Sequence, residues 1–226
     1  MPLSRARGLI CLVTDRRRLA QAALAVNLED QIASACRAGV DLIQIRERDL
    51  DAKALTSLVT RCVAAAKGTS TRIIVNDRLD VALSSGAHGV HLRSDSIVAV
   101  RARELSPPGF IIGRSVHGVE EAVAAERSGG LDYVILGTVF PTESKDPSQR
   151  LTTMTGLATA CALVSIPVLA IGGITAARAE DIIKTGAAGI AAIGLFLPDP
   201  AASVDQQLAA RVLELRRVFD TCGAVP

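Results

Sequence analysis

Residues 71–92 read TRIIVNDRLDVALSSGAHGVHL, and this stretch contains one full repeat of the pattern on which the fold depends. It begins with an apolar β-branched run at residues 73–75, which ends at the polar pair Asn76-Asp77. A segment of helical periodicity follows, and the stretch closes on a second short run at residues 89–92. Consecutive apolar residues are typical of a parallel strand that is buried on both faces. The stretch therefore predicts a strand, a helix and a second strand.

The same alternation of short apolar runs and longer helical segments continues along the whole chain. A helical segment follows each expected strand, and the expected strands lie at residues 9–14, 40–46, 71–76, 89–92, 110–113, 133–136, 168–171 and 189–193. Eight such units in 226 residues fit a closed barrel, whereas a doubly wound open sheet usually has fewer strands and leaves edges. We therefore expect an α/β fold, a single (β/α)8 TIM barrel.

No shift in composition and no linker rich in proline or serine divides the chain. Residues 1–226 are therefore expected to form one TIM-barrel domain with its core at about residues 9–218, and residues 1–8 and 221–226 are expected to be loose ends. One connection differs from the short loops elsewhere, because GTVFPTESKDPSQRL at residues 137–151 is long, polar and contains proline. Loops of this kind are usually lids or disordered tips.

Composition argues against several kinds of partner. The 25 Lys and Arg residues nearly balance the 23 Asp and Glu residues, and no segment has the basic excess typical of proteins that bind nucleic acid or anionic membranes. Aromatic residues form only 2% of the chain, which is too few for base-stacking platforms. The five scattered cysteines lack C-x-x-C spacing, so we expect neither a disulfide framework nor a zinc site. No apolar run is long enough for a membrane span, and we expect a cytoplasmic protein; a homo-oligomer is left open.

Polar residues gather where the expected strands end. In a (β/α)8 barrel the carboxyl ends of all strands meet on one face, which carries the chemistry in enzymes of this fold. The residues at these ends are Thr14, Asp15, Gln44, Arg46, Arg48, Asn76, Asp77, His91, Asp95, Ser115, His117 and residues 142–145. A purely structural barrel would not need so many, although solvated loop ends are polar in any case.

Glycines mark the ends of the last two strands. Gly172-Gly173 follows the strand at residues 168–171 and opens a helix, and Gly194 follows the eighth strand. Backbone N–H groups at such positions can approach a phosphate closely, and barrel enzymes frequently bind phosphate after strands seven and eight. Two ordinary turns would give the same glycines, but the pairing of the two positions favours a phosphate site.

Three cations, Arg46, Arg48 and Lys145, are expected on the same face and suit an anion with more charge than one phosphate. Asp77 is a candidate ligand for Mg²⁺, which prefers oxygen ligands and commonly bridges to substrate phosphates. Asp77 also directly precedes a helix, so an N-cap is nearly as good an interpretation, and the two roles are compatible.

His117 is a candidate general acid or base, although a single histidine after a strand is as often structural. His88 and His91 are three residues apart in a strand region, so they do not share a face and do not form a metal pair. The residues alone therefore indicate an enzyme for a phosphorylated small molecule, with Mg²⁺ as a candidate cofactor, and they do not name the reaction.

Seven motifs resemble the thiamine phosphate synthase/TenI family in sequence, order and spacing. They are LVTD at 12–15, IQIRER at 43–48, VNDRLDVAL at 75–83, HGVHL at 88–92, IGRSVH at 112–117, DYVILGTVFPTESK at 132–145 and AIGGIT at 170–175. The resemblance covers about residues 9–196, and it implies a (β/α)8 barrel, in agreement with the strand pattern.

This family contains two activities. The synthase is a transferase of thiamine biosynthesis that joins hydroxymethylpyrimidine diphosphate to thiazole phosphate, which gives thiamine phosphate and diphosphate. The TenI-type tautomerase is an isomerase that converts thiazole carboxylate phosphate to its aromatic form. The resemblance implies the synthase first and the tautomerase as the alternative, and a non-catalytic sensor of thiazole or thiamine phosphate is a third interpretation.

For a synthase, the resemblance implies a role for each residue of the ring. Contacts to the pyrimidine and the diphosphate fall on Gln44, Arg46, Arg48, Asn76, Ser115 and Lys145. Contacts to the thiazole phosphate fall on Thr142, Ser144, Gly172, Gly173, Ile193 and Gly194, and Mg²⁺ falls on Asp77. Arg46, Ser115 and Lys145 are the expected catalytic residues of the synthase, and His117 is a further catalytic candidate, as a proton-transfer group. Stabilisation of the departing diphosphate by cations would be the main catalytic effect, so no protein nucleophile is required.

Three positions depart from the usual synthase pattern. The second metal-binding Asp of the synthases falls on Ser96 here, and Asp95, one residue away, is a candidate ligand if its loop is rearranged. Arg93 is an alternative source of positive charge at that place. Arg48 stands where the synthases usually have Lys, and Gly194 stands where they usually have Ser.

The departures bear on the choice between the two activities. TenI-type members often lack the metal Asp, and they carry an RER sequence and a histidine like His117 that is proposed for proton transfer. Gln44, Asp77 and the PTESK loop favour the synthase, since an isomerase that handles no diphosphate would not need them.

Overall fold

The computed structural model describes residues 8–22, 26–142 and 151–223, and it shows a closed barrel of parallel strands. The strands follow one another around the barrel in chain order, and β8 closes the barrel against β1. They are β1 (Leu9–Val13), β2 (Leu42–Ile45), β3 (Arg72–Asn76), β4 (Gly89–Leu92), β5 (Ile111–Val116), β6 (Tyr133–Gly137), β7 (Val168–Ile171) and β8 (Gly189–Ala192). The fold that the strand pattern predicts is confirmed.

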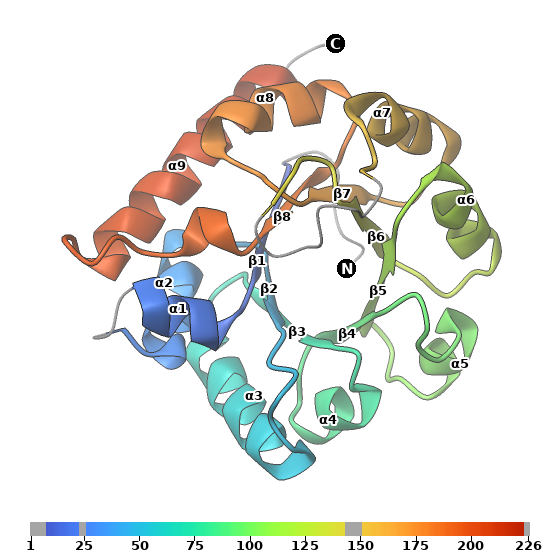
Figure 1. Ribbon diagram of the computed structural model, residues 1–226. Coiled ribbons are helices and arrows are strands. Elements are labelled where there is room, and N and C mark those ends of the chain that lie inside the picture. The colour runs from blue at the N-terminus through green and yellow to red at the C-terminus, as the bar shows by residue number, and fades with distance from the viewer. Residues whose placement is uncertain (1–7, 23–25, 143–150, 224–226) are drawn as a thin grey trace.

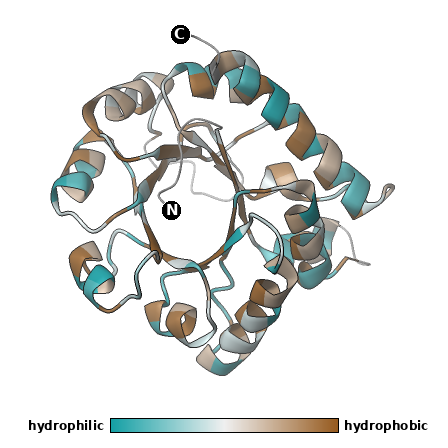
Figure 2. Cartoon of the chain, turned by 180° about the vertical axis from the view of Figure 1, so that it is seen from behind, coloured by the Kyte–Doolittle hydropathy of each residue, from teal (hydrophilic) through white to brown (hydrophobic). Residues whose placement is uncertain are grey.

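Helices surround the barrel on the outside, as the view along its axis shows (Figure 1). They are α1 (Arg16–Ala22), α2 (Leu28–Ala38), α3 (Ala52–Ala66), α4 (Leu79–Ser84), α5 (Ala99–Glu104), α6 (Val119–Arg127), α7 (Met154–Leu163), α8 (Ala176–Lys184) and α9 (Val204–Gly223), with the 3₁₀ turn η1 (Gly194–Phe196) after β8. Figure 2 shows the strands as largely hydrophobic and the helices as mixed, as expected when each helix presents one apolar face to the sheet.

The apolar core has an inner and an outer part because successive residues of a strand point to opposite faces. On β1, Cys11 and Val13 belong to the cluster inside the barrel, whereas Ile10 and Leu12 pack with the helices. The inner cluster is aliphatic apart from Cys11 and Tyr133, whose ring is fully buried. The barrel interior is therefore a packed core, and chemistry is confined to an end of the barrel.

Two boundaries differ from the expected ones by three residues, whereas the other strand ends differ by two residues at most. The fifth strand was expected at residues 110–113, but β5 continues to Val116, because it goes on pairing with β6 through two polar residues. Residues 221–223 belong to α9 rather than to a loose end. Arg216 on this helix donates to the carbonyl oxygen of Gly8 at 2.6 Å and pairs with Asp41 at 2.6 Å, which ties the helix to the amino-terminal end of the barrel.

Two further expectations concern the long loop after β6 and membrane-spanning segments. Residues 143–150 of the long loop lie outside the described residues, so a role as a lid stays a prediction. Within the described part of the chain, no helix combines the length and apolar character that crossing a membrane requires.

Candidate active site

A cavity of about 480 Å³ lies at the carboxyl ends of the strands. Most of the residues expected at the site line it, although they come from positions far apart in the sequence. These are Gln44, Arg46, Arg48, Asn76, Ser115, His117, Thr142, Gly172, Gly173, Ile193 and Gly194. The parallel barrel brings them together because all of its strands end on one face.

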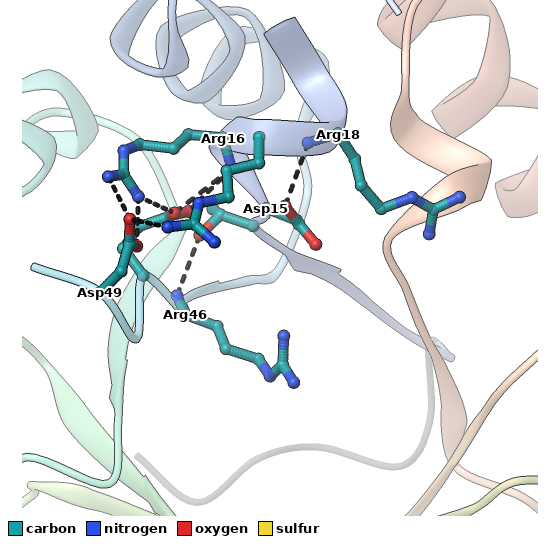
Figure 3. Close-up of polar contacts among 8 residues, drawn as sticks. Asp15, Arg16, Arg18, Arg46 and Asp49 are labelled. Atoms are coloured by element: carbon teal, nitrogen blue, oxygen red, sulfur yellow. Dashed lines mark hydrogen bonds and ion pairs between the residues drawn. The ribbon is translucent and has the colours of Figure 1, made fainter. Parts of the chain in front are cut away.

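A hydrogen-bonded cluster joins the loops after β1 and β2 (Figure 3). The carboxylate of Glu47 is 5% exposed; it accepts from the hydroxyl of Thr14 at 2.7 Å and from the backbone N–H and side chain of Arg16. Arg16 also pairs with Asp49, and this partner holds the pKa of the Asp49 carboxyl well below its usual range. The backbone N–H of Arg46 donates to the Thr14 hydroxyl at 2.9 Å, so the cluster fixes the point from which the Arg46 side chain enters the cavity.

Positive charge is concentrated on the β2 side of the cavity. Figure 3 shows the Arg46 guanidinium directed away from the cluster that holds its backbone. Burial lowers the pKa of Arg46, and the neighbouring charge of Arg48 lowers it further. A polyanionic ligand stabilises a partly buried guanidinium that lies near a second positive charge, which is the electrostatic setting that a diphosphate requires.

Buried polar side chains form the floor of the cavity. Gln44 donates from Nε2 to Oδ1 of Asn76 at 2.9 Å, which fixes both amides. His91 is 1% exposed, with Nδ1 3.1 Å from the Tyr133 hydroxyl and Nε2 2.9 Å from the Ser115 hydroxyl. Burial, with a smaller contribution from the charge of Arg114, lowers the pKa of His91 to about 3, so the imidazole is neutral at neutral pH.

The two bonds of His91 determine the direction of the Ser115 hydroxyl. A neutral imidazole donates from one nitrogen and accepts at the other, and a buried Tyr133 hydroxyl is fully satisfied when it donates to Nδ1. Nε2 then carries the proton and donates to Oγ of Ser115. The O–H of Ser115 therefore remains a donor for a ligand in the cavity.

Glycines form the wall on the β7 side. The backbone at Gly172 and Gly173 has φ values of 101° and 60°, a region that favours glycine. A Cβ at Gly172 would lie 2.4 Å from Cγ2 of Thr138, so this wall has no room for a side chain. Arg178 donates to the carbonyl oxygen of Gly173 at 2.6 Å and stacks on the ring of Phe140 at 4.3 Å, which fixes the turn. A phosphate can thus approach this backbone closely.

His117 lies at the rim of the cavity, where hydrogen bonds hold its ring and its main chain. Its Nδ1 is 2.9 Å from the carbonyl oxygen of Gly137, which can only accept, so Nδ1 carries the proton. In the neutral ring Nε2 is then the acceptor. The backbone N–H of His117 donates to Glu121, and its carbonyl oxygen accepts from Thr152. These contacts fix the orientation of the ring at the rim of the cavity.

The two expected metal ligands do not line the cavity themselves. Asp77, with φ of 65°, accepts a hydrogen bond from the Ser96 hydroxyl, and Nη1 of Arg93 lies 3.8 Å from its Oδ2. The Asp95 side chain is 66% exposed and pairs with Arg93 at 2.7 Å. Asp77 is not the N-cap of α4, because Arg78 occupies that position without a side-chain capping bond.

This arrangement bears on how a magnesium ion is bound. No group of three or more His, Cys, Asp or Glu side chains within residues 8–22, 26–142 and 151–223 is arranged to hold a metal ion. One carboxylate, that of Asp77, lies at the end of β3 beside the cavity floor. Mg²⁺ is commonly bound by one or two carboxylates together with substrate phosphates and water, so this donor set fits an ion that arrives with a diphosphate.

Two expected site residues are not described by the structure, and several residues that line the cavity were not expected there. Ser144 and Lys145 lie outside the described residues. Arg93, the expected alternative source of positive charge, lines the cavity. Further polar residues that had been given no role at the site also line it, namely Asp15, Arg18, His91, Ser94 and Thr138. Asp15 and His91 follow the strand-end rule that found the others, whereas nothing in the sequence RRR at residues 16–18 distinguishes Arg18 from its neighbours.

The chain matches known proteins over most of its length. Residues 10–196 match a family described as thiamine monophosphate synthase. The chain is 38% identical to the thiamine-phosphate synthase of Roseiflexus castenholzii over 208 residues, which cover 90% of this chain and 88% of the relative. It is 42% identical to that of Archaeoglobus fulgidus over 192 residues, which cover 84% of this chain and 88% of the relative.

A solved structure resembles the fold just described. It is the thiamine phosphate pyrophosphorylase from Pyrococcus furiosus, with a TM-score of 0.80 and 31% sequence identity. The match covers 96% of this chain and 98% of that one. The similarity thus extends over the barrel and all the elements that contribute to the cavity.

Proposed function

The chain belongs to the thiamine monophosphate synthase family, and we propose that it joins hydroxymethylpyrimidine diphosphate to thiazole phosphate, with thiamine phosphate and diphosphate as products. The observation that carries this proposal is the division of the cavity into two anion-binding sides. Arg46 and Arg48 enter from the end of β2, and the glycine wall follows β7. An enzyme that joins two phosphorylated substrates needs two such sides.

Each substrate is assigned to one side of the cavity. The diphosphate lies with Arg46 and Arg48, and the pyrimidine lies over Gln44, Asn76 and Ser115, whose amide and hydroxyl groups suit the nitrogens of that ring. The thiazole phosphate lies against Thr142, Gly172, Gly173, Ile193 and Gly194. Ser144 and Lys145 were predicted for the thiazole phosphate and the diphosphate respectively, and both assignments stay predictions.

The reaction forms one bond and breaks one. The C–O bond between the pyrimidine methylene carbon and the diphosphate breaks, and its electron pair leaves with the diphosphate. The lone pair of the thiazole nitrogen forms the new C–N bond to the same carbon. Arg46 and Arg48 stabilise the negative charge that develops on the leaving group, and the partly buried, preformed position of Arg46 makes this stabilisation larger than in water. Ser115 donates to the same region from a fixed direction.

Mg²⁺ completes this proposal as the expected cofactor, with Asp77 as its ligand from the chain. When bound, the ion would neutralise further charge on the diphosphate. Arg93, which pairs with Asp77 and lines the cavity, adds positive charge at the same end of the barrel. We further propose that residues 1–226 act as one domain in the cytoplasm, because cysteines that are scattered along the chain without C-x-x-C spacing are typical of a reducing compartment.

The tautomerase is the second candidate, and one observation favours it. The contact of His117 with the carbonyl oxygen of Gly137 leaves Nε2 as a proton acceptor at the rim of the cavity. An isomerase that moves a proton on thiazole carboxylate phosphate needs such a group. The synthase is preferred because the relatives of the chain bear that name and because an isomerase that handles no diphosphate does not need Gln44 and Asp77.

The two reactions can be measured side by side on the purified protein. One sample receives pyrimidine diphosphate and aromatic thiazole phosphate, and the other receives thiazole carboxylate phosphate alone, each with and without Mg²⁺. The proposal predicts thiamine phosphate in the first sample only with Mg²⁺, with a severe loss in Arg46→Ala and a mild one in His117→Ala. Isomerisation in the second sample that survives EDTA and is lost in His117→Ala would establish the tautomerase instead.

A further inference from the structure

One basic side chain of the cavity, that of Arg18, was not among the expected site residues. It lies on the β8 side of the cavity. Arg18, in the first turn of α1, lines the cavity together with Gly172, Gly173 and Gly194. Its backbone N–H donates to Oδ1 of Asp15 at 3.1 Å, which fixes the start of the helix. Figure 3 shows its guanidinium directed away from the cluster around Asp49 and toward the ribbon of β8 and η1.

The space above Gly194 is open and borders this guanidinium. Among the described residues, a Cβ built at Gly194 would have one neighbour within 4 Å, which is Nη2 of Arg18 at 3.8 Å. This differs from Gly172, where a Cβ would collide with the Thr138 side chain. A ligand group can therefore occupy the position beside Gly194, and the nearest side-chain atom that it would meet is a cationic donor.

Two backbone N–H groups border the same space. In the part of the chain that the structure describes, no hydrogen-bond acceptor pairs with the backbone N–H of Gly173 or of Gly194. Both groups border the cavity, and neither has a side chain that would keep an anion away. Two backbone N–H groups and one guanidinium form a donor set that suits the oxygens of a phosphate monoester.

We propose that Arg18 binds the phosphate of the thiazole substrate, together with the backbone N–H groups of Gly173 and Gly194. This inference rests on the proposed function, since that function supplies the ligand. It gives each anionic substrate its own arginine, because Arg46 and Arg48 reach the diphosphate from β2 and Arg18 reaches the phosphate from α1. Arg18 is therefore a specificity residue, which distinguishes thiazole phosphate from the unphosphorylated thiazole alcohol.

The test compares Arg18→Ala and Arg18→Gln with the matched control Arg17→Ala. Arg17 is the neighbouring residue on the same helix; its side chain is 72% exposed and pairs with Asp49 outside the cavity. In Arg18→Ala we expect the KM for thiazole phosphate to rise about tenfold or more, while kcat and the KM for pyrimidine diphosphate change less than about twofold. Arg18→Gln keeps most of the side-chain stem and should show the same increase, and Arg17→Ala should resemble the unaltered protein.

A second substrate separates phosphate binding from a structural effect. With thiazole alcohol in place of thiazole phosphate, the rates of the unaltered protein and of Arg18→Ala should agree. An equal loss with both substrates, or an unchanged KM for thiazole phosphate in both Arg18 variants, would overturn the proposal.

A binding measurement distinguishes a failure of this inference from a failure of the proposed function. Calorimetric titration of thiazole phosphate into the folded proteins should show weaker binding in Arg18→Ala, with inorganic phosphate as a competitor in the unaltered protein. If the unaltered protein forms no thiamine phosphate but this difference in binding is found, the proposed function fails and the role of Arg18 stands. If thiamine phosphate forms and the binding does not differ, the role of Arg18 fails alone.

Discussion

The hydroxyl of Tyr133 lies 3.1 Å from Nδ1 of His91, in a part of the barrel where neither side chain is accessible to water. Through His91 this contact reaches Ser115, whose hydroxyl is 2.9 Å from Nε2 and borders the cavity. Burial raises the pKa of Tyr133 well above its usual value, so its hydroxyl keeps its proton and remains a donor. A residue that lies outside the cavity thus determines how a residue inside it presents its proton.

Replacement of Tyr133 by Phe removes the donor to Nδ1 and keeps the ring. A buried imidazole nitrogen that loses its partner costs about 1–3 kcal/mol, and we expect a decrease of that size in the free energy of unfolding. The imidazole can then exchange its proton between the two nitrogens, so kcat should fall while the KM for thiazole phosphate stays constant. Urea denaturation and steady-state kinetics measure the two effects; an unchanged kcat would show that the contact serves stability alone.

The buried imidazole also predicts how stability depends on pH. The pKa of His91 is lowered from 6.5 to about 3 in the folded protein, first by burial and then by the charge of Arg114. Between these two values the unfolded chain binds a proton that the folded chain does not, so stability increases with pH across this window and the contribution is complete above it. The free energy of unfolding should therefore fall as the pH decreases from about 6.5 toward about 3.

A variant separates this effect from the titration of carboxylates. His91→Gln has no group that titrates in the window, so its free energy of unfolding should decrease less steeply than that of the unaltered protein. The NMR signals of the His91 ring should show no titration above about pH 5. A midpoint near the ordinary histidine value would contradict the buried, neutral imidazole.

Gly113 makes room for the Tyr133 ring, and this predicts a severe effect of a single methyl group. A Cβ at Gly113 would lie 2.1 Å from Cζ of Tyr133, within the packed interior of the barrel. We expect Gly113→Ala to destabilise the fold by about 2 kcal/mol or more, because the ring and its bond to His91 must shift. Gly118 is the matched control: it follows β5, and a Cβ there meets nothing within 4 Å among the described residues. Equal melting temperatures for the two variants would refute the close packing of Gly113 against Tyr133.

Substitution of the two expected metal ligands, Asp77 and Asp95, should have different effects because the two side chains lie in different surroundings. Asp77→Ala should lower the rate of thiamine phosphate formation about 100-fold and reduce its dependence on Mg²⁺. Asp95→Ala should have a small effect, because its carboxylate is exposed and pairs with Arg93. Asp80→Asn removes a neighbouring exposed carboxylate that pairs with Arg78, and it serves as the control. A loss in Asp95→Ala as large as that in Asp77→Ala would mean that Asp95 reaches the ion during the reaction.

The sequence was sufficient for the barrel because the strands are encoded locally. Runs such as residues 73–75 are apolar at consecutive positions, and this pattern identifies a strand buried on both faces without any tertiary information. The boundary of β5 was placed too early because Arg114 and Ser115 interrupt the apolar run. Ser115 is polar because it faces the cavity rather than the packed core. The apolar pattern therefore ends before the strand does.

The site could be predicted where a residue lies directly at the end of a strand, as Gln44 and Asn76 do. Arg18 could not be predicted, since it lies within a basic triplet that is typical of a solvated helix face. Only the fold brings its Nη2 to 3.8 Å from the Cβ position at Gly194. The position of Asp95 depends on its ion pair with Arg93, which directs the carboxylate to the surface, and a loop sequence does not reveal such a pairing.

The most direct test of the proposed reaction is its stoichiometry with limiting pyrimidine diphosphate and excess thiazole phosphate in the presence of Mg²⁺. Thiamine phosphate and diphosphate should form in equal amounts, each equal to the pyrimidine diphosphate consumed, and Arg46→Ala should slow the formation of both products together. Release of diphosphate without thiamine phosphate, or no reaction of these two substrates in a protein that isomerises thiazole carboxylate phosphate, would contradict it.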